Sequence, residues 1–165
     1  GFKLDEPAHL YNRGEVHNLE VRRGTLSFEE RFKINDHIVQ TIKMLEELPY
    51  PRHLRNVPEI AGGHHETLRG TGYPRKLTGD QMSVTAKMMV IADVFEALTA
   101  SDRPYKKAKK LSDAVNIMAM MQKGGHFDPD LYRLFLTSGI YRQYGEQYLE
   151  PSQIDEVDIE KYLEA

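Results

Sequence analysis

The longest regular pattern of apolar and polar positions begins near residue 28 and predicts a helix over residues 28–48. Ser27 and Glu30 form a capping box, in which each side chain accepts a hydrogen bond from the backbone of the other residue. Pro49 ends the pattern because proline cannot continue a helix. Apolar residues recur close to every 3.6 positions, at Phe28, Phe32, Ile34, Ile38, Ile42, Leu45 and Leu48.

Two more helices are predicted on either side of a loop. Residues 52–65 are expected to form a helix with Pro58 at an early position, and its end carries two adjacent histidines. Residues 68–82 are rich in Gly, Pro, Thr and charged residues, which is typical of a loop. Ser83 is a suitable N-cap for a helix through Ala100, with Met88, Ile91, Val94, Phe95 and Leu98 on its buried side.

The rest of the chain continues the helical pattern in shorter pieces. Ser112 is the expected cap of a helix through Gln122, and a short helix follows over residues 130–136. Gly139 separates that helix from the end of the chain. We expect the acidic residues 151–165 to form a final turn or helix and otherwise to be solvated.

Residues 1–24 show no sustained period, so we expect an irregular lead-in with one weak strand candidate over residues 16–21. Every long predicted element is helical, and the predicted fold class is therefore all-α. We divide the chain into this lead-in, a helical domain over residues 25–150 and an acidic tail over residues 151–165.

Composition narrows the chemistry available to this helical domain. With 165 residues, of which 40% are hydrophobic, the chain can form one domain with its own core. A net charge of −3 argues against binding to a nucleic-acid polymer or a membrane surface, which requires a basic excess. Without cysteine, metal ligands have to be His, Asp or Glu. No apolar run could span a membrane and no signal peptide is visible, which predicts a cytoplasmic protein.

The adjacent pair His64-His65 is the strongest candidate for ligand chemistry. Two glycines precede the pair and Glu66 follows it, and glycine lets the backbone pack close to whatever the imidazoles hold. Adjacent side chains on a helix diverge by about 100°. The pair could therefore ligate two neighbouring ions, or one ring could bind while the other packs. We expect the isolated histidines to be ordinary packed or surface residues, namely His9, His17, His53 and His126.

Asp93 is a second candidate because it lies inside an otherwise apolar helix. An ionised carboxylate in that setting is costly unless a cation or strong hydrogen bonds compensate it. The residues alone leave two roles open, a metal ligand and a partner in a structural ion pair. His37 shares a predicted helix face with Ile34 and Thr41 and is a weaker candidate by itself.

Two further segments suit phosphate binding, and each also has a simpler explanation. Residues 70–74, Gly-Thr-Gly-Tyr-Pro, offer backbone N–H groups, a hydroxyl and a phenol, but glycine loops are often only turns. In the basic run over residues 102–107, Arg103 can make bidentate bonds to phosphate and Lys106 adds positive charge. Taken alone, that run is better explained as a solvated basic loop.

Taken together, four motifs resemble the HD-GYP family of metal-dependent phosphohydrolases. These are His64-His65-Glu66, the Gly-Thr-Gly-Tyr-Pro loop, the segment 91–99 around Asp93, and Arg103-Pro104-Tyr105-Lys106, all in the family's order and spacing. The resemblance implies an all-helical bundle of the HD superfamily that hydrolyses cyclic di-GMP with two or three divalent ions, commonly iron or manganese.

The same resemblance assigns roles to individual residues. It implies metal ligands at His37, His64, His65 and Asp93, and catalytic roles for His65, Asp93 and Glu66, where Glu66 would orient His64 or His65. It implies substrate binding by Gly72, Tyr73, Pro74, Arg103 and Lys106. The implied reaction is metal-assisted hydrolysis of a phosphodiester.

The sequence departs from the family pattern at two places. The family's His-Asp dyad lies well upstream of the His37 position, and no His-Asp dipeptide occurs in this chain. Since Gly1 is not an initiator methionine, we expect the dyad to precede it, and we expect this chain alone to hold metal only partly and to show little activity. Arg69 is the second departure, because the family usually shows an acid there.

Two alternatives to a cyclic di-GMP phosphodiesterase stay open. The first is a phosphohydrolase for another nucleotide, since nothing in the sequence identifies guanine. The second is a degenerate signalling module whose Gly-Tyr-Pro loop docks a partner such as a diguanylate cyclase domain, and Arg69 is the residue that supports it. The short helices after residue 128 either pack on the core or mediate a homodimer.

Overall fold

The computed structural model describes residues 1–5, 26–101 and 108–163. Over these residues the secondary structure is helical, and no strand occurs beyond an isolated bridge between Arg69 and Thr78. The longer helices are α2 (Phe28–Glu46), α3 (Val57–Gly62), α4 (Val84–Thr99), α5 (Leu111–Lys123), α6 (Pro129–Thr137) and α7 (Ile140–Tyr148). Short elements are α8 (Glu160–Leu163) and the 3₁₀ turns Arg52–Leu54, Gly79–Gln81 and Pro151–Gln153. The all-α prediction is confirmed.

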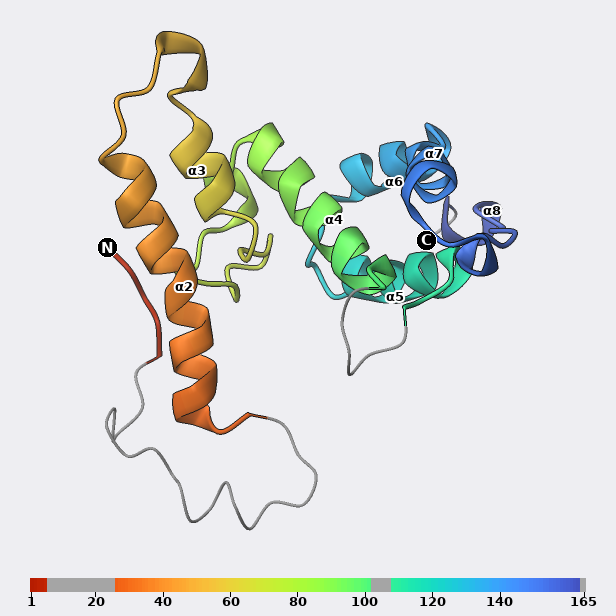
Figure 1. The fold of residues 1–165 in the computed structure, drawn as a ribbon, viewed down its shortest axis with the longest axis horizontal. Helices are drawn as coiled ribbons and strands as arrows, with labels where there is room; N and C mark the ends of the chain where they lie inside the picture. The colour runs from red at the N-terminus through yellow and green to blue at the C-terminus, as the bar shows by residue number, and fades with distance from the viewer. Residues whose placement is uncertain (6–25, 102–107, 164–165) are drawn as a thin grey trace.

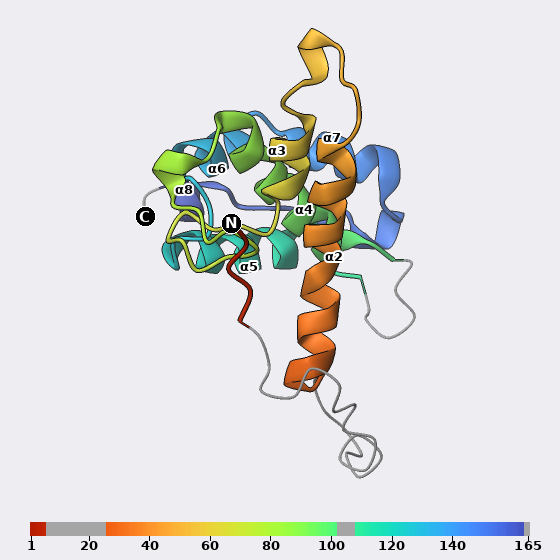
Figure 2. The same ribbon diagram turned by 90° about the vertical axis from the view of Figure 1, so that its left-hand side faces the viewer.

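The helices form two groups that α4 connects (Figure 1). Helices α2 and α3 pack side by side, α3 packs on α4, and α4 packs on α5 and α6. Helices α5, α6 and α7 gather around the far end of α4 (Figures 1 and 2). The loop between α3 and α4 therefore lies where the two groups meet.

The predicted capping box at the start of α2 is present. The Glu30 N–H donates to Ser27 Oγ at 3.2 Å, and the Ser27 N–H donates to Glu30 Oε2 at 2.8 Å. Helix α2 ends at Glu46, two residues before the predicted end. Its buried residues Ile38, Val39 and Ile42 lie about one helical turn apart, as the apolar period predicts.

The predicted helix over residues 52–65 is wrong in extent. Residues Arg52–Leu54 form only a 3₁₀ turn, and α3 occupies Val57–Gly62 with Pro58 in its first turn. A side chain at Gly62 would come within 2.7 Å of Ile42, so this glycine lets α3 approach α2 closely. Because α3 ends at Gly62, the two histidines lie in the turn that follows the helix.

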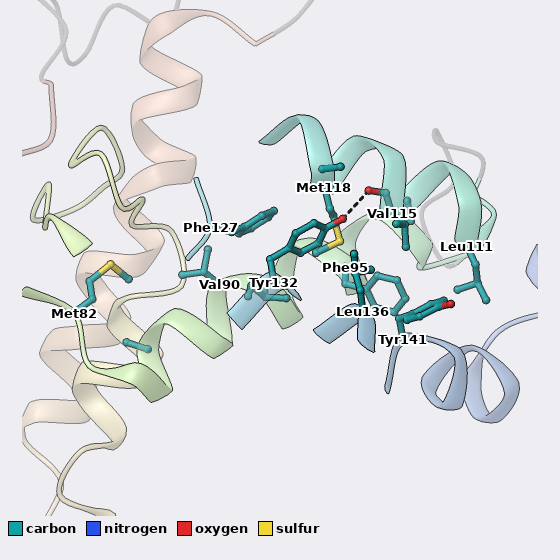
Figure 3. Packing of buried hydrophobic residues seen from close by; sticks show 14 residues of the cluster. Met82, Val90, Phe95, Leu111, Val115, Met118, Phe127, Tyr132, Leu136 and Tyr141 are labelled. Atoms are coloured by element: carbon teal, nitrogen blue, oxygen red, sulfur yellow. Dashed lines mark hydrogen bonds between the residues drawn. The ribbon is translucent and has the colours of Figure 1, made fainter. Parts of the chain in front are cut away.

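Helix α4 begins as predicted and forms one side of the main core (Figure 3). Ser83 is its N-cap, and the Ala86 N–H donates to Ser83 Oγ at 3.2 Å. The Tyr132 hydroxyl lies within this core and donates to the Val115 carbonyl oxygen at 2.9 Å. Buried core side chains from α4 through α7 include Val90, Ile91, Phe95, Leu111, Val115, Met118, Phe127, Leu136 and Tyr141.

Two predictions for the carboxyl-terminal part are wrong. Ser112 does not cap α5, because that helix already begins at Leu111 with Lys110 as its N-cap. Instead the backbone N–H and hydroxyl of Ser112 donate to the Asp155 carboxylate at 2.9 and 2.7 Å. Helix α7 was not predicted, because glycine is a poor helix former and the local pattern is not strongly apolar. It packs through Tyr141 and Gly145, which are buried.

The acidic end of the chain packs on the core and is not simply solvated. Gln153 is only 6% exposed. Its amide group donates to the carbonyl oxygens of Thr99 and Lys109 at 2.8 and 2.9 Å. The partly buried residues Ile154, Val157, Ile159, Tyr162 and Leu163 cover the same core. Among the described residues, no helix has the length and apolar character needed to cross a membrane.

Candidate metal centre

Three imidazole rings from separate parts of the chain converge beside α2. His37 comes from the middle of α2, and His64 and His65 come from the turn after α3. One ring nitrogen of each residue lies within 4.8 Å of the others. Nitrogens on one ion at about 2.1 Å would lie within about 4.2 Å of each other. Small ring rotations would therefore let all three bind a single divalent ion, and imidazole suits zinc, iron and related metals.

The backbone orients two of these rings. His37 Nδ1 donates to the carbonyl oxygen of Ile34, and His64 Nδ1 donates to the carbonyl oxygen of Ala61 at 2.6 Å. A proton held at Nδ1 leaves Nε2 as the unprotonated nitrogen. Such second-shell hydrogen bonds are typical of metal-bound histidines. The local backbone of α2 and α3 therefore presents two Nε2 atoms as ligands.

His65 is held differently from the other two rings. Its Nε2 lies 3.4 Å from Nε2 of His37, and its ring stacks on Tyr73 with centroids 4.6 Å apart and an interplanar angle of 23°. The pKa of His65 is lowered from 6.5 to about 4, mainly by burial and then by the charge of His64, against an opposing effect of Asp93. His65 is therefore neutral near pH 7, as a metal ligand has to be.

Asp93 lies on α4, near the histidines but outside their group of ligand atoms. It is partly buried. Its charge raises the pKa of His65, and it also raises the pKa of Tyr73, for which burial is the larger cause. The structure thus places a negative charge beside the three imidazoles. Its assignment as a fourth ligand stays a prediction.

Glu66 faces the following loop. Its side chain is fully buried, at 0% exposure. Its two carboxylate oxygens accept from the backbone N–H groups of Arg75 at 2.7 Å and Leu77 at 2.9 Å. The expectation that Glu66 directly orients His64 or His65 does not match this geometry, because both oxygens already hold the loop backbone.

The Gly-Tyr-Pro loop folds back onto the backbone of the histidine pair. The Tyr73 N–H donates to the carbonyl oxygen of His65 at 3.1 Å. A Cβ atom at Gly72 would lie 2.5 Å from that same oxygen, so only glycine permits this approach. Pro74 is buried. The predicted site residues Gly72, Tyr73 and Pro74 are thus brought directly beside His65.

Arg69 points away from the histidines. Its Nη1 donates to the carbonyl oxygen of Gly124, the C-cap of α5, at 3.0 Å. A cation at a helix C-terminus is favourable because the last carbonyl groups carry partial negative charge. The arginine therefore adds no positive charge to the metal centre, although the family usually shows an acid at this position.

The remaining predicted residues lie elsewhere. Arg103 and Lys106 lie outside the described residues, as do His9 and His17. His53 is exposed, and the half-buried His126 packs against Phe127 with ring centroids 5.0 Å apart. The ordinary roles expected for His53 and His126 agree with these positions.

A comparison with protein families connects this geometry to known proteins. A family model described as an HD domain matches residues 1–131. The chain belongs to the HD-domain family. The match and the cluster of His37, His64 and His65 together confirm the resemblance to the HD superfamily that the motifs indicated. Members of the HD-domain family bind divalent metal ions, which fits the donor set of this chain.

Several curated proteins resemble this HD domain. It is 44% identical over 86 residues to a cyclic di-GMP phosphodiesterase of Pseudomonas aeruginosa, PA4108, covering 52% of this chain and 20% of that protein. It is 42% identical over 147 residues to the 3′3′-cGAMP-specific phosphodiesterase 1 of Vibrio cholerae, covering 84% and 33%. It is 31% identical over 132 residues to a cyclic di-GMP phosphodiesterase of Thermotoga maritima, covering 78% and 35%. The chain thus spans at most 35% of the length of these three relatives.

Proposed function

We propose that the protein containing this HD domain is a metal-dependent phosphodiesterase that hydrolyses cyclic di-GMP in bacterial signalling. The observation that carries the proposal is the convergence of three imidazoles whose ligand nitrogens lie within 4.8 Å of one another. The names of the relatives support a cyclic dinucleotide as substrate, since they act on cyclic di-GMP or on 3′3′-cGAMP.

The residues of this chain prepare the site for a divalent ion. His37 and His64 direct Nε2 inward because their Nδ1 atoms donate to backbone carbonyls. His65 stays neutral near pH 7, so no proton has to leave it before an ion binds. Asp93 adds a negative charge nearby, which favours a cation. A bound divalent ion, which we propose to be iron or manganese, would supply Lewis-acid polarisation of the phosphodiester.

The docking alternative has lost the feature that supported it. A positive charge inside the ligand cluster would have weakened ion binding, but Arg69 is bonded to the C-cap of α5. The choice between cyclic di-GMP and another cyclic dinucleotide therefore becomes the main question about the substrate.

The test uses the whole protein with iron or manganese, supplied with cyclic di-GMP and separately with 3′3′-cGAMP. We expect cyclic di-GMP to be hydrolysed. We expect His65→Ala and Asp93→Asn each to lower kcat/KM by at least about 100-fold, because removing a ligand or its balancing charge disrupts the centre. The matched control is His53→Ala, an exposed histidine outside the cluster, which should retain wild-type activity. Equal activity of all four proteins would refute the site assignment.

A further inference from the structure

The three imidazoles of the metal centre differ in what orients them. His37 and His64 each donate from Nδ1 to a backbone carbonyl oxygen, those of Ile34 and Ala61. His65 makes no such bond to any residue that the structure describes. Its ring contacts are the other two imidazoles and the ring of Tyr73, and the Tyr73 contact is the most nearly parallel of them, at 23°.

The Tyr73 ring is itself fixed by three contacts that involve the backbone. The Tyr73 N–H donates to the His65 carbonyl oxygen at 3.1 Å, and Gly72 lets the loop approach that oxygen closely. Two residues beyond Tyr73, the buried Glu66 carboxylate accepts from the Arg75 N–H. The loop cannot shift without breaking these bonds, so the tyrosine ring presents a fixed flat surface to His65.

We propose that Tyr73 is a positioning residue for the ligand His65, and that its ring supplies the orientation which backbone carbonyls supply to His37 and His64. The inference rests on the proposed metal centre. It gives Tyr73 a role before any substrate arrives, in addition to lining the site. It also gives Glu66 an indirect role, because Glu66 holds the loop that holds Tyr73.

The physical reason is the conformational freedom of a histidine side chain. An imidazole without a hydrogen bond at its outer nitrogen can rotate about χ2, which has a broad energy profile. A stacked aromatic ring removes that freedom before an ion binds, so less entropy is lost on coordination. Groups that orient a metal ligand typically contribute a factor of about 10–100 in metal affinity.

The test measures binding of Co²⁺ to the metal-free whole protein by its visible absorption, which reports affinity and ligand geometry together. We expect Tyr73→Leu to lower the Co²⁺ affinity by about 10–100-fold and to change the absorption bands. Tyr73→Phe keeps the ring and should restore wild-type affinity and bands. The matched control is Tyr148→Leu, since Tyr148 is 64% exposed on α7 and lies outside the site.

The outcomes separate this inference from the proposed function. Wild-type affinity in Tyr73→Leu, or equal losses in Tyr73→Leu and Tyr73→Phe, would overturn the role of the ring, whether or not cyclic di-GMP is hydrolysed. Absence of Co²⁺ binding by the wild type would overturn both. Hydrolysis that fails while the predicted Co²⁺ pattern holds would leave the positioning role intact and refute only the enzyme.

Circular dichroism establishes that each variant is folded. If Tyr73→Leu is unfolded, nuclear magnetic resonance of the metal-free wild type and Tyr73→Phe decides instead. A ring stacked at 4.6 Å should shift the His65 ring protons upfield in both proteins. Unshifted His65 protons would overturn the inference.

Discussion

Replacing Glu66 with glutamine should release the loop after the histidine pair while keeping the shape of the side chain. The wild-type carboxylate accepts from the Arg75 N–H at 2.7 Å and from the Leu77 N–H at 2.9 Å, in a fully buried position. Glutamine has one acceptor oxygen and one donor group. It can therefore satisfy only one of these N–H groups, and its own NH₂ group faces the other.

The magnitude follows from these two hydrogen bonds. A bond to a charged acceptor contributes about 1.5–3 kcal/mol, and a neutral bond contributes about 1 kcal/mol. A buried N–H group left without an acceptor costs about 1–3 kcal/mol. We therefore expect Glu66→Gln to lower the free energy of unfolding by about 2–4 kcal/mol, with loop opening as the first consequence.

Urea unfolding at pH 7 measures the change, and amide hydrogen exchange locates it. A loss of about 2 kcal/mol corresponds to roughly 30-fold faster exchange at Arg75 and Leu77. The matched control is Glu46→Gln, because Glu46 also bonds Arg75, through Nη2 at 2.9 Å, but its side chain is 52% exposed. The control should change stability by less than about 0.5 kcal/mol. Equal effects of the two substitutions would refute the role assigned to Glu66.

Three further predictions concern the loop, the ligand His65 and the ion pair under α4. Gly72→Ala places a Cβ atom 2.5 Å from the His65 carbonyl oxygen, so it should lower stability by about 2 kcal/mol or more and weaken Co²⁺ binding; calorimetry and the Co²⁺ titration check both, and a wild-type result would contradict the close approach. In a nuclear magnetic resonance titration of the metal-free protein, His65 should titrate near pH 4, because burial and then His64 lower its pKa, and a midpoint near 6.5 would refute this. Asp128→Asn should cost about 1–3 kcal/mol at pH 7 by breaking the 3.1 Å ion pair with Lys87. Burial alone would raise the pKa of Asp128, but Lys87 and backbone N–H groups hold the pKa below 3.8. The wild-type advantage should therefore be complete above about pH 5 and disappear as pH falls through that pKa; an advantage that persists at pH 2 in urea unfolding would contradict it.

The sequence predicted the elements whose determinants are local. The capping box of Ser27 and Glu30 and the N-cap Ser83 both form as expected, because each joins residues only three positions apart. The histidine cluster was also foreseen, through motif resemblance. Periodicity alone had left His37 a weak candidate, and only its order relative to the histidine pair pointed to a shared ion.

Features that depend on distant residues could not be predicted in this way. Ser112 looked like a cap, but the acceptor at the start of α5 is Asp155, 43 positions away. Helix α7 is stabilised by contacts of its tyrosines and Gly145 with other helices, and little in its local pattern announces it. Arg69 could have pointed into the site or away from it, and its bond to Gly124, 55 positions away, decided the direction.

The sequence by itself therefore determined the all-α class, most helix starts and the identity of the imidazole ligands. These depend on residue type, local caps and short spacing, which the chain carries regardless of how it folds. Only the tertiary structure decided the direction of Glu66, the stacking of Tyr73 on His65 and the orientation of each imidazole. A side chain's partner is set by which backbone groups surround it after folding, and that arrangement is not written in its neighbours along the chain.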